Sequence, residues 1–211
     1  IFKNSITNKI NSAWEAFNFN LKKELTSTSW LRKAGIIGVA EKKMSVKKGD
    51  SIKKYAAKEI ATTEYSFLKN LAAIAYITKI IGQNDVLIKN LGANAIYLYS
   101  LHKSFYKKLS NNLAESLNKD DTSYIKKSCN PIESMVNLPK WESKTCSYNK
   151  NYANFIKKKS YSKEFRLRIG NIFSTPMQRS MRYSLMSSEV GCPNKKEISK
   201  VIKKVNACQK K

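Results

Sequence analysis

The sequence predicts an all-α protein, an elongated bundle of about six helices. Turn-forming residues are scarce, because the 211 residues include seven glycines and four prolines, fewer than the many turns of a β-sandwich need. Hydrophobic residues make up 42% of the chain, which is enough to build a core. Apolar side chains recur at intervals of three and four over long stretches, a pattern typical of helices that pack lengthwise against one another.

We expect two regions, an N-terminal helical extension with a connector (residues 1–50) and a main domain (residues 51–211). The spacing of apolar residues in the extension indicates one amphipathic helix, with Ile10, Trp14, Phe17 and Leu21 on its apolar face. Residues 32–50 contain three glycines and many charges, which indicates a connector. The chain begins without methionine, so we expect a longer parent protein.

The main domain is expected to begin with two long helices. The first runs from near Ser51 to the "GQND" turn at 82–85, and the second from about Val86 to Leu117. The inward side of the first consists of Ile60, Glu64, Phe67, Leu71, Ile74, Thr78 and Ile81. That of the second consists of Leu91, Ile96 or Ala95, Leu98, Leu101, Phe105, Leu109 and Leu113.

The remaining helices are expected at 141–159, 163–190 and 194–208. Between 122 and 140, Pro131 and Pro139 limit the length of any helix. Pro176 is expected to bend the helix that contains it, and Pro193 suits the start of the last one.

The formal net charge of +25 implies attraction to polyanions, namely nucleic acid, an anionic membrane surface or an acidic protein. A solvated lysine surface without a partner is the plainer interpretation. The four cysteines (Cys129, Cys146, Cys192 and Cys208) form no CxxC pair, and the single histidine, His102, cannot complete a zinc site of the usual spacing. We therefore expect free thiols in a reducing compartment. One histidine and no clustered carboxylates also disfavour a hydrolase or a metalloenzyme.

The arginines are unevenly placed. Only five of the 40 basic residues are arginine, and four of them lie between 166 and 182. Arg179 and Arg182 are three apart, so each can form forked hydrogen bonds with a carboxylate on a neighbouring helix. Glu64, on the inward side of the first long helix, is the expected partner of one of them. The alternative is that this face meets another protein.

Four segments resemble one family in its own order. "TPMQRSMRYSLM" (175–186) resembles the third conserved region of Dbl-homology domains, the catalytic domains of exchange factors for Rho-family GTPases. "KEIATTEYSFLKNL" (58–71) is similar to the first conserved region, and "IYLYSLHKSFYKKL" (96–109) to the second helix. "VIKKVNACQ" (201–209) resembles the last helix, so the resemblance covers about residues 51–211.

The resemblance implies a guanine nucleotide exchange factor that prefers the nucleotide-free form of a Rho-family GTPase. Such a protein releases GDP by remodelling the switch regions, without bond chemistry, cofactor or metal of its own. Glu59 matches the glutamate that engages switch I, while Thr175, where many members have lysine, and Asn206 match positions that face switch II. The motifs add Thr63, Gln178, Arg179 and Arg182 to the GTPase-binding set, the last three with a second role in holding the helix in place.

Two other functions stay open: a basic helical nucleic-acid-binding protein, and a scaffold with the same fold but without exchange activity. Against the first, no element has an arginine-rich or aromatic-interleaved face, so we expect no nucleic acid partner. We expect a cytoplasmic signalling protein whose basic surface lies against anionic lipid at the inner face of a membrane. For a secreted microbial effector, the corresponding place is the host cytosol.

Overall fold

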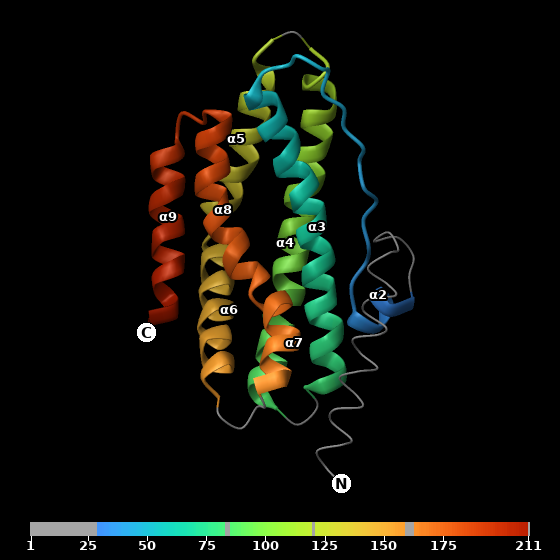
Figure 1. Cartoon of the computed structure of the whole chain (residues 1–211), viewed down its shortest axis with the longest axis vertical. Coiled ribbons are helices and arrows are strands. Elements are labelled where there is room, and N and C mark those ends of the chain that lie inside the picture. Colours follow the sequence, from blue (N-terminus) through green and yellow to red (C-terminus); the bar gives the residue numbers. More distant parts are fainter. Residues whose placement is uncertain (1–28, 83–84, 120, 159–162, 211) are drawn as a thin grey trace.

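The computed structural model describes residues 29–82, 85–119, 121–158 and 163–210, and within them every regular element is helical (Figure 1). The long helices lie side by side along the long axis of the molecule, as predicted for an elongated bundle. The elements are α2 (Ser29–Ala34), α3 (Ile52–Ile81), α4 (Val86–Ser116), α5 (Ser123–Val136), α6 (Pro139–Lys157), α7 (Lys163–Phe173), α8 (Thr175–Val190), α9 (Lys195–Ala207) and a short 3-10 helix, η1 (Cys208–Lys210). No helix in these ranges combines the length and the apolar composition that crossing a membrane requires.

The bounds of α3 and α4 agree with the prediction because both helices carry local start and stop signals. The hydroxyl of Ser51 accepts a hydrogen bond from the Lys54 backbone N–H, and the Asp85 carboxylate accepts from the first N–H groups of α4. The N–H of Gly82 donates to the Thr78 carbonyl and closes α3. The two helices pack closely, because a Cβ atom on Gly92 of α4 would collide with the side chain of Thr78.

The predicted inward sides of α3 and α4 are correct with few exceptions. Most of the predicted residues are buried, and Ala95 is buried while Ile96 is exposed, which resolves the alternative between them. The exceptions are Ile81 and Leu101, which are half-buried. Leu101 lines a groove between α4 and α5.

The two prolines between 122 and 140 act differently from the expectation. Pro131 lies inside α5, where the burial of its ring next to Ile132 offsets the backbone hydrogen bond that proline removes. Pro139 is the first residue of α6, a position that leaves no N–H unsatisfied. The prolines therefore mark one helix interior and one helix start, and the segment is helical on both sides of Asn137.

The stretch 163–190 is divided into α7 and α8, which meet at Ser174. Pro176 therefore stands in the first turn of α8 and does not bend a continuous helix. The core-facing side of α8 follows helical spacing and includes Pro176, Arg179, Tyr183, Met186 and Val190.

The described part of the N-terminal region, residues 29–50, is docked on the bundle and is not a free linker. Leu31, Ile36 and Val39 belong to the same buried core as the long helices. The hydroxyl of Tyr99 donates to the Ile37 carbonyl at 3.1 Å, which fixes the segment to α4. The predicted helix around residues 10–21 lies outside the described residues, and the domain boundary at residue 50 stays a prediction.

Candidate functional site: the α3, α8 and α9 face

The N-terminal half of α3 presents a polar stripe to solvent. Glu59, Thr62 and Ser66 are exposed, whereas Ile60 and Glu64 on the opposite side of the helix are buried. Among the described residues, the Glu59 carboxylate takes part in no hydrogen bond and no ion pair. A charged group in this state is available to a partner protein.

Directly beneath this stripe lies a buried polar cluster centred on Glu64, whose side chain is 0% exposed. Arg179 of α8 donates to Glu64 Oε2 from both Nε (3.0 Å) and Nη2 (2.7 Å). The hydroxyl of Tyr183 donates to the same oxygen at 2.6 Å, and Nδ1 of His102 lies 2.7 Å from Oε1. The indole N–H of Trp141 donates to His102 Nε2, so Nδ1 carries the proton of a neutral His102 and donates to Glu64. Glu64 of α3 is thus tied directly to α4 and α8, and through His102 to Trp141 of α6.

The electrostatics of this cluster favour an ionised Glu64. Burial alone would raise the pKa of Glu64, but the Arg179 guanidinium, His102 and the Tyr183 hydroxyl together hold that pKa below its ordinary value. Burial, together with the negative charge of Glu64, raises the pKa of Tyr183 well above its usual range, so this hydroxyl stays a donor. The cluster is therefore a satisfied ion pair with supporting hydrogen bonds.

Two consecutive residues of α8 connect the other elements of the face. Arg179 Nη1 donates to the hydroxyl of Thr63 at 2.7 Å, and that hydroxyl donates to the Glu59 carbonyl, also at 2.7 Å. The hydroxyl of Ser180 donates a shared hydrogen bond to the Met177 carbonyl at 2.8 Å and to Oδ1 of Asn206 on α9 at 3.3 Å. Helix α8 packs against both α3 and α9, so this pair links the helix of Glu59 to the helix of Asn206 (Figure 1).

The other predicted site residues of α8 lie in different surroundings. Thr175 is half-buried and its hydroxyl donates to the Ile172 carbonyl. Gln178 is exposed and its amide donates to the Ser174 hydroxyl, whereas Arg182 is exposed with no hydrogen-bond partner among the described residues. Asn206 is half-buried, and within the described ranges its amide N–H₂ group donates no hydrogen bond.

Arg179 was predicted as a residue of the GTPase-binding surface, but it is buried. Its side chain is only 5% exposed, because its donors are directed at Glu64, Thr63 and the Ile60 carbonyl. The prediction of a carboxylate partner is right for Arg179 and wrong for Arg182, which forms no ion pair in the described part of the chain. Arg179 can position the face from below, but it cannot lie against a partner.

Two exposed apolar residues of α8 were not predicted from the sequence. Met181 and Leu185 are 44% and 59% exposed on α8, although both are large and apolar. Together with Gln178 and Arg182 they follow the spacing of a helix surface, so this spacing in "MQRSMRYSLM" was the available signal. Exposed apolar side chains beside polar ones are typical of a protein-binding surface.

The cysteines contradict the expectation of free thiols. Cys129 of α5 is bonded to Cys192, just before α9, and Cys146 of α6 is bonded to Cys208, just after it. Helix α9 is therefore attached covalently at both ends. It buries only Ile198, Ile202 and Val205, so the two bonds add to a small apolar contact. Their effect is to hold the helix of Asn206 in place.

No group of three or more His, Cys, Asp or Glu side chains in the described ranges is placed to hold a metal ion. The face therefore offers contacts to a partner: the Glu59 carboxylate, the amides of Gln178 and Asn206, the Arg182 guanidinium and the apolar side chains of α8.

Comparison with known families gives a match over most of the chain. The family model described as RhoGEF domain matches residues 56–210, which is well over half of the chain. Searches among curated proteins and among solved structures found no match. The matched range includes the Glu64 cluster, Glu59 and Asn206. The chain therefore belongs to the RhoGEF domain family, the Dbl-homology exchange factors.

Proposed function

We propose that this chain binds a Rho-family GTPase in its nucleotide-free form and accelerates GDP release from it. The observation that supports this proposal is the arrangement of α3, α8 and α9. Arg179 and Ser180 are neighbours on one turn of α8. Arg179 donates to Thr63, one turn after Glu59 on α3, and Ser180 contacts Asn206 on α9. An acid on one helix and an amide on another are thereby supported by a common element.

The mechanism follows from linkage. An exchange factor that binds the nucleotide-free GTPase more tightly than the nucleotide-loaded GTPase must weaken nucleotide binding. The affinity for nucleotide falls by the same ratio as that between the two affinities of the exchange factor. We assign Glu59 to switch I, and Asn206, with Thr175, to switch II, whose rearrangement removes ligands from the nucleotide and its Mg²⁺. The buried Glu64 cluster keeps α3 and α8 in register, so the binding energy is not spent on ordering the face.

Thr175 sets a limit on the strength of the switch II contact. Its hydroxyl is bonded to the Ile172 carbonyl and carries no charge. A lysine at this position would offer a charge-assisted hydrogen bond, a contact worth about 1.5–3 kcal/mol. The exposed Met181 and Leu185 offer apolar area further along the same helix. We infer that this chain depends more on apolar contact with switch II than family members with lysine do.

The net charge of +25 supports a second proposal, association with an anionic membrane surface. We expect sedimentation with vesicles that contain phosphatidylserine and none with neutral vesicles. Binding to both kinds of vesicle, or to neither, would contradict it.

The test of exchange is the release of a fluorescent GDP analogue from a panel of Rho-family GTPases, with a Ras-family GTPase as an outgroup. We expect acceleration for at least one member, reduced roughly tenfold or more by Glu59→Ala and by Asn206→Ala. Matched controls are Glu115→Ala on α4 and Asn154→Ala on α6, an exposed acid and an exposed amide outside the face.

The proposal fails if no GTPase responds, or if the control variants lose as much activity as the face variants. Absence of exchange together with retained binding through the same residues would instead identify a scaffold. Tight, salt-sensitive binding of RNA or DNA without any effect on a GTPase would favour the nucleic-acid alternative.

A further inference from the structure

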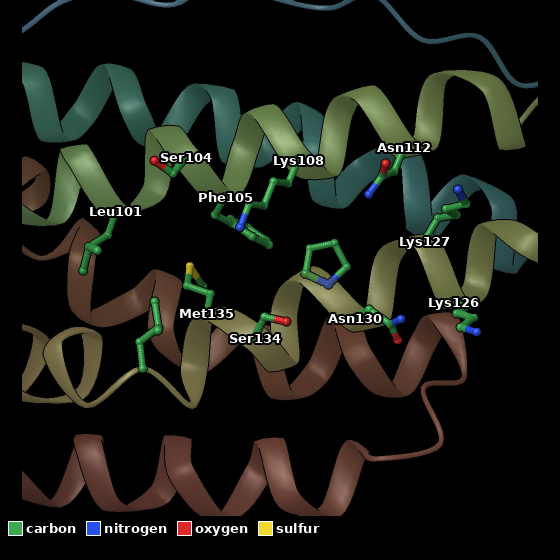
Figure 2. A pocket seen from close by; sticks show the side chains of 12 residues that line it. Leu101, Ser104, Phe105, Lys108, Asn112, Lys126, Lys127, Asn130, Ser134 and Met135 are labelled. Carbon is green, nitrogen blue, oxygen red and sulfur yellow. The ribbon is translucent and has the colours of Figure 1, made fainter.

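A groove of about 600 Å³ lies between α4 and α5, on elements that carry none of the predicted GTPase-binding residues (Figure 2). One end is apolar: Leu101 of α4 and Met135 of α5 point into it. Leu138, three residues after Met135, is 44% exposed, and Phe105 forms part of the buried floor. This end therefore leaves apolar surface in contact with water.

The other end of the groove is basic. Lys126 and Lys127 of α5 lie there together with Asn112 of α4, and Lys108 lies between the two ends (Figure 2). All three lysines are exposed, and none has an ion-pair partner in the described ranges. None of the twelve residues that line the groove is acidic. The groove thus combines an apolar end with a cationic end.

The dimensions fit a short helix. Leu101 and Asn112 are eleven residues apart on α4, a span of about 16 Å at 1.5 Å per residue, or three helical turns. A helix of that length can place apolar residues at i, i+3, i+4 and i+7 on one side, which is how amphipathic helices occupy apolar grooves. Acidic residues in its first turn are favoured by its own dipole, and would lie against Lys126 and Lys127.

We propose that the α4–α5 groove is a docking site for an amphipathic helix of a partner protein, acidic in its first turn and apolar in the next two turns. The acidic turn lies at Lys126 and Lys127, and the apolar turns lie at Leu101, Met135 and Leu138. The inference does not depend on the exchange activity, because it concerns a different face of the bundle.

Other occupants fit the groove less well. A second copy of the chain offers no acidic helix, because each described α-helix carries more basic than acidic residues. Nucleic acid has phosphates for the lysines, but the other end of the groove is mainly apolar and has no cationic side chain for further phosphates. An acyl chain needs an enclosed apolar cavity, whereas this groove is partly open to solvent.

The groove is also close to the Glu64 cluster. The ring of Phe105 lies edge-on to the ring of Tyr183, with 6.0 Å between centroids, and Tyr183 donates to Glu64. A helix in the groove would therefore rest on Phe105, which contacts Tyr183 of the buried Glu64 cluster. That cluster lies beneath the α3, α8 and α9 face. This contact offers a route by which the docked helix can stiffen that support.

The test uses the full chain and a designed, fluorescein-labelled peptide of about twelve residues. Glutamates fill its first turn, leucines follow at helical spacing on one side, and alanines fill the remaining positions. Fluorescence anisotropy is expected to detect binding that falls about fivefold in the variant Lys126→Gln/Lys127→Gln. The matched control Lys150→Gln/Lys157→Gln, two exposed lysines of α6, is expected to bind as the unaltered chain does.

The apolar end is tested separately. Leu138→Ala is expected to weaken peptide binding, whereas Leu167→Ala, at an exposed leucine of α7, is not. A peptide with serine in place of leucine, and one with glutamine in place of glutamate, are both expected to bind more weakly than the parent peptide.

Failure of the parent peptide to bind, or equal losses in the two lysine-pair variants, would overturn the proposal. It would also be overturned if vesicles containing phosphatidylserine displaced the peptide and required Lys126, Lys127 and Leu138 for their own binding. That result would assign the groove to lipid.

Discussion

Replacement of Arg179 by methionine tests the buried Glu64 cluster most directly. Arg179 is nearly fully buried and donates to Glu64, Thr63 and the Ile60 carbonyl. Methionine fills much of the same volume, but it leaves the Glu64 carboxylate in the core without its countercharge. Loss of one partner of a buried ion pair typically costs about 3–5 kcal/mol.

Tyr183 and His102 moderate that loss, because both still donate to Glu64 in the variant. We therefore expect the lower part of the range, about 3 kcal/mol, for Arg179→Met. The double variant Glu64→Gln/Arg179→Met carries no buried charge at this point and is expected to be more stable than Arg179→Met alone. Arg182→Met, three residues along the same helix but exposed, is expected to change stability by less than about 0.5 kcal/mol.

The assay is urea unfolding at pH 7 and 25 °C, followed by far-UV circular dichroism under non-reducing conditions. The reasoning is refuted if Arg179→Met is no less stable than Arg182→Met. It is also refuted if the double variant loses the full sum of the two single losses, because residues of one buried pair must show coupling.

Three further predictions concern pH, the disulfides and helix packing. The pKa of Glu64 is lower in the folded than in the unfolded protein, so its ionised form stabilises the fold above the ordinary pKa of 4.5. This contribution is lost as pH falls through the folded-state pKa. The variant Glu64→Gln should therefore show a flatter loss of stability at acid pH. A thiol titration of the unfolded, unreduced protein should find no reactive thiol, and four thiols before reduction would contradict the structure. The variant Cys192→Ser removes a disulfide that joins residues 63 positions apart, and it should lower the free energy of unfolding by about 4 kcal/mol. Gly92→Ala should destabilise the protein, because the added methyl group collides with Thr78 where α3 and α4 meet. Gly170→Ala adds a methyl group in open space and should stabilise α7 by about 0.5–1 kcal/mol. Equal changes in the melting temperatures of the two variants would contradict this.

The parts of the fold that could be predicted are those with local signals. Ser51, Gly82 and Asp85 cap α3 and α4, and each is recognisable from residue type and position. Glu64 could be assigned a buried arginine partner because an acid at an inward position needs a countercharge. These inferences require only helical periodicity and electrostatics.

Features set by tertiary contacts could not be predicted. Arg179 and Arg182 lie three residues apart on one helix, and the packing of α8 against its neighbours decides which of them faces the core. The disulfides join residues more than sixty positions apart, and only the folded arrangement brings their Cα atoms to 5.5 and 5.4 Å. The groove escaped notice because Pro131 obscured the helix that forms one of its walls.

The most direct test of the central claim is a comparison of affinities for two forms of one GTPase. A Rho-family GTPase that responds in the release assay is prepared free of nucleotide and, separately, loaded with GDP and Mg²⁺, and the affinity of the chain for each form is measured by titration calorimetry. We predict at least about tenfold tighter binding to the nucleotide-free form, because linkage requires that preference for accelerated release. Equal affinity for the two forms would contradict the proposed mechanism.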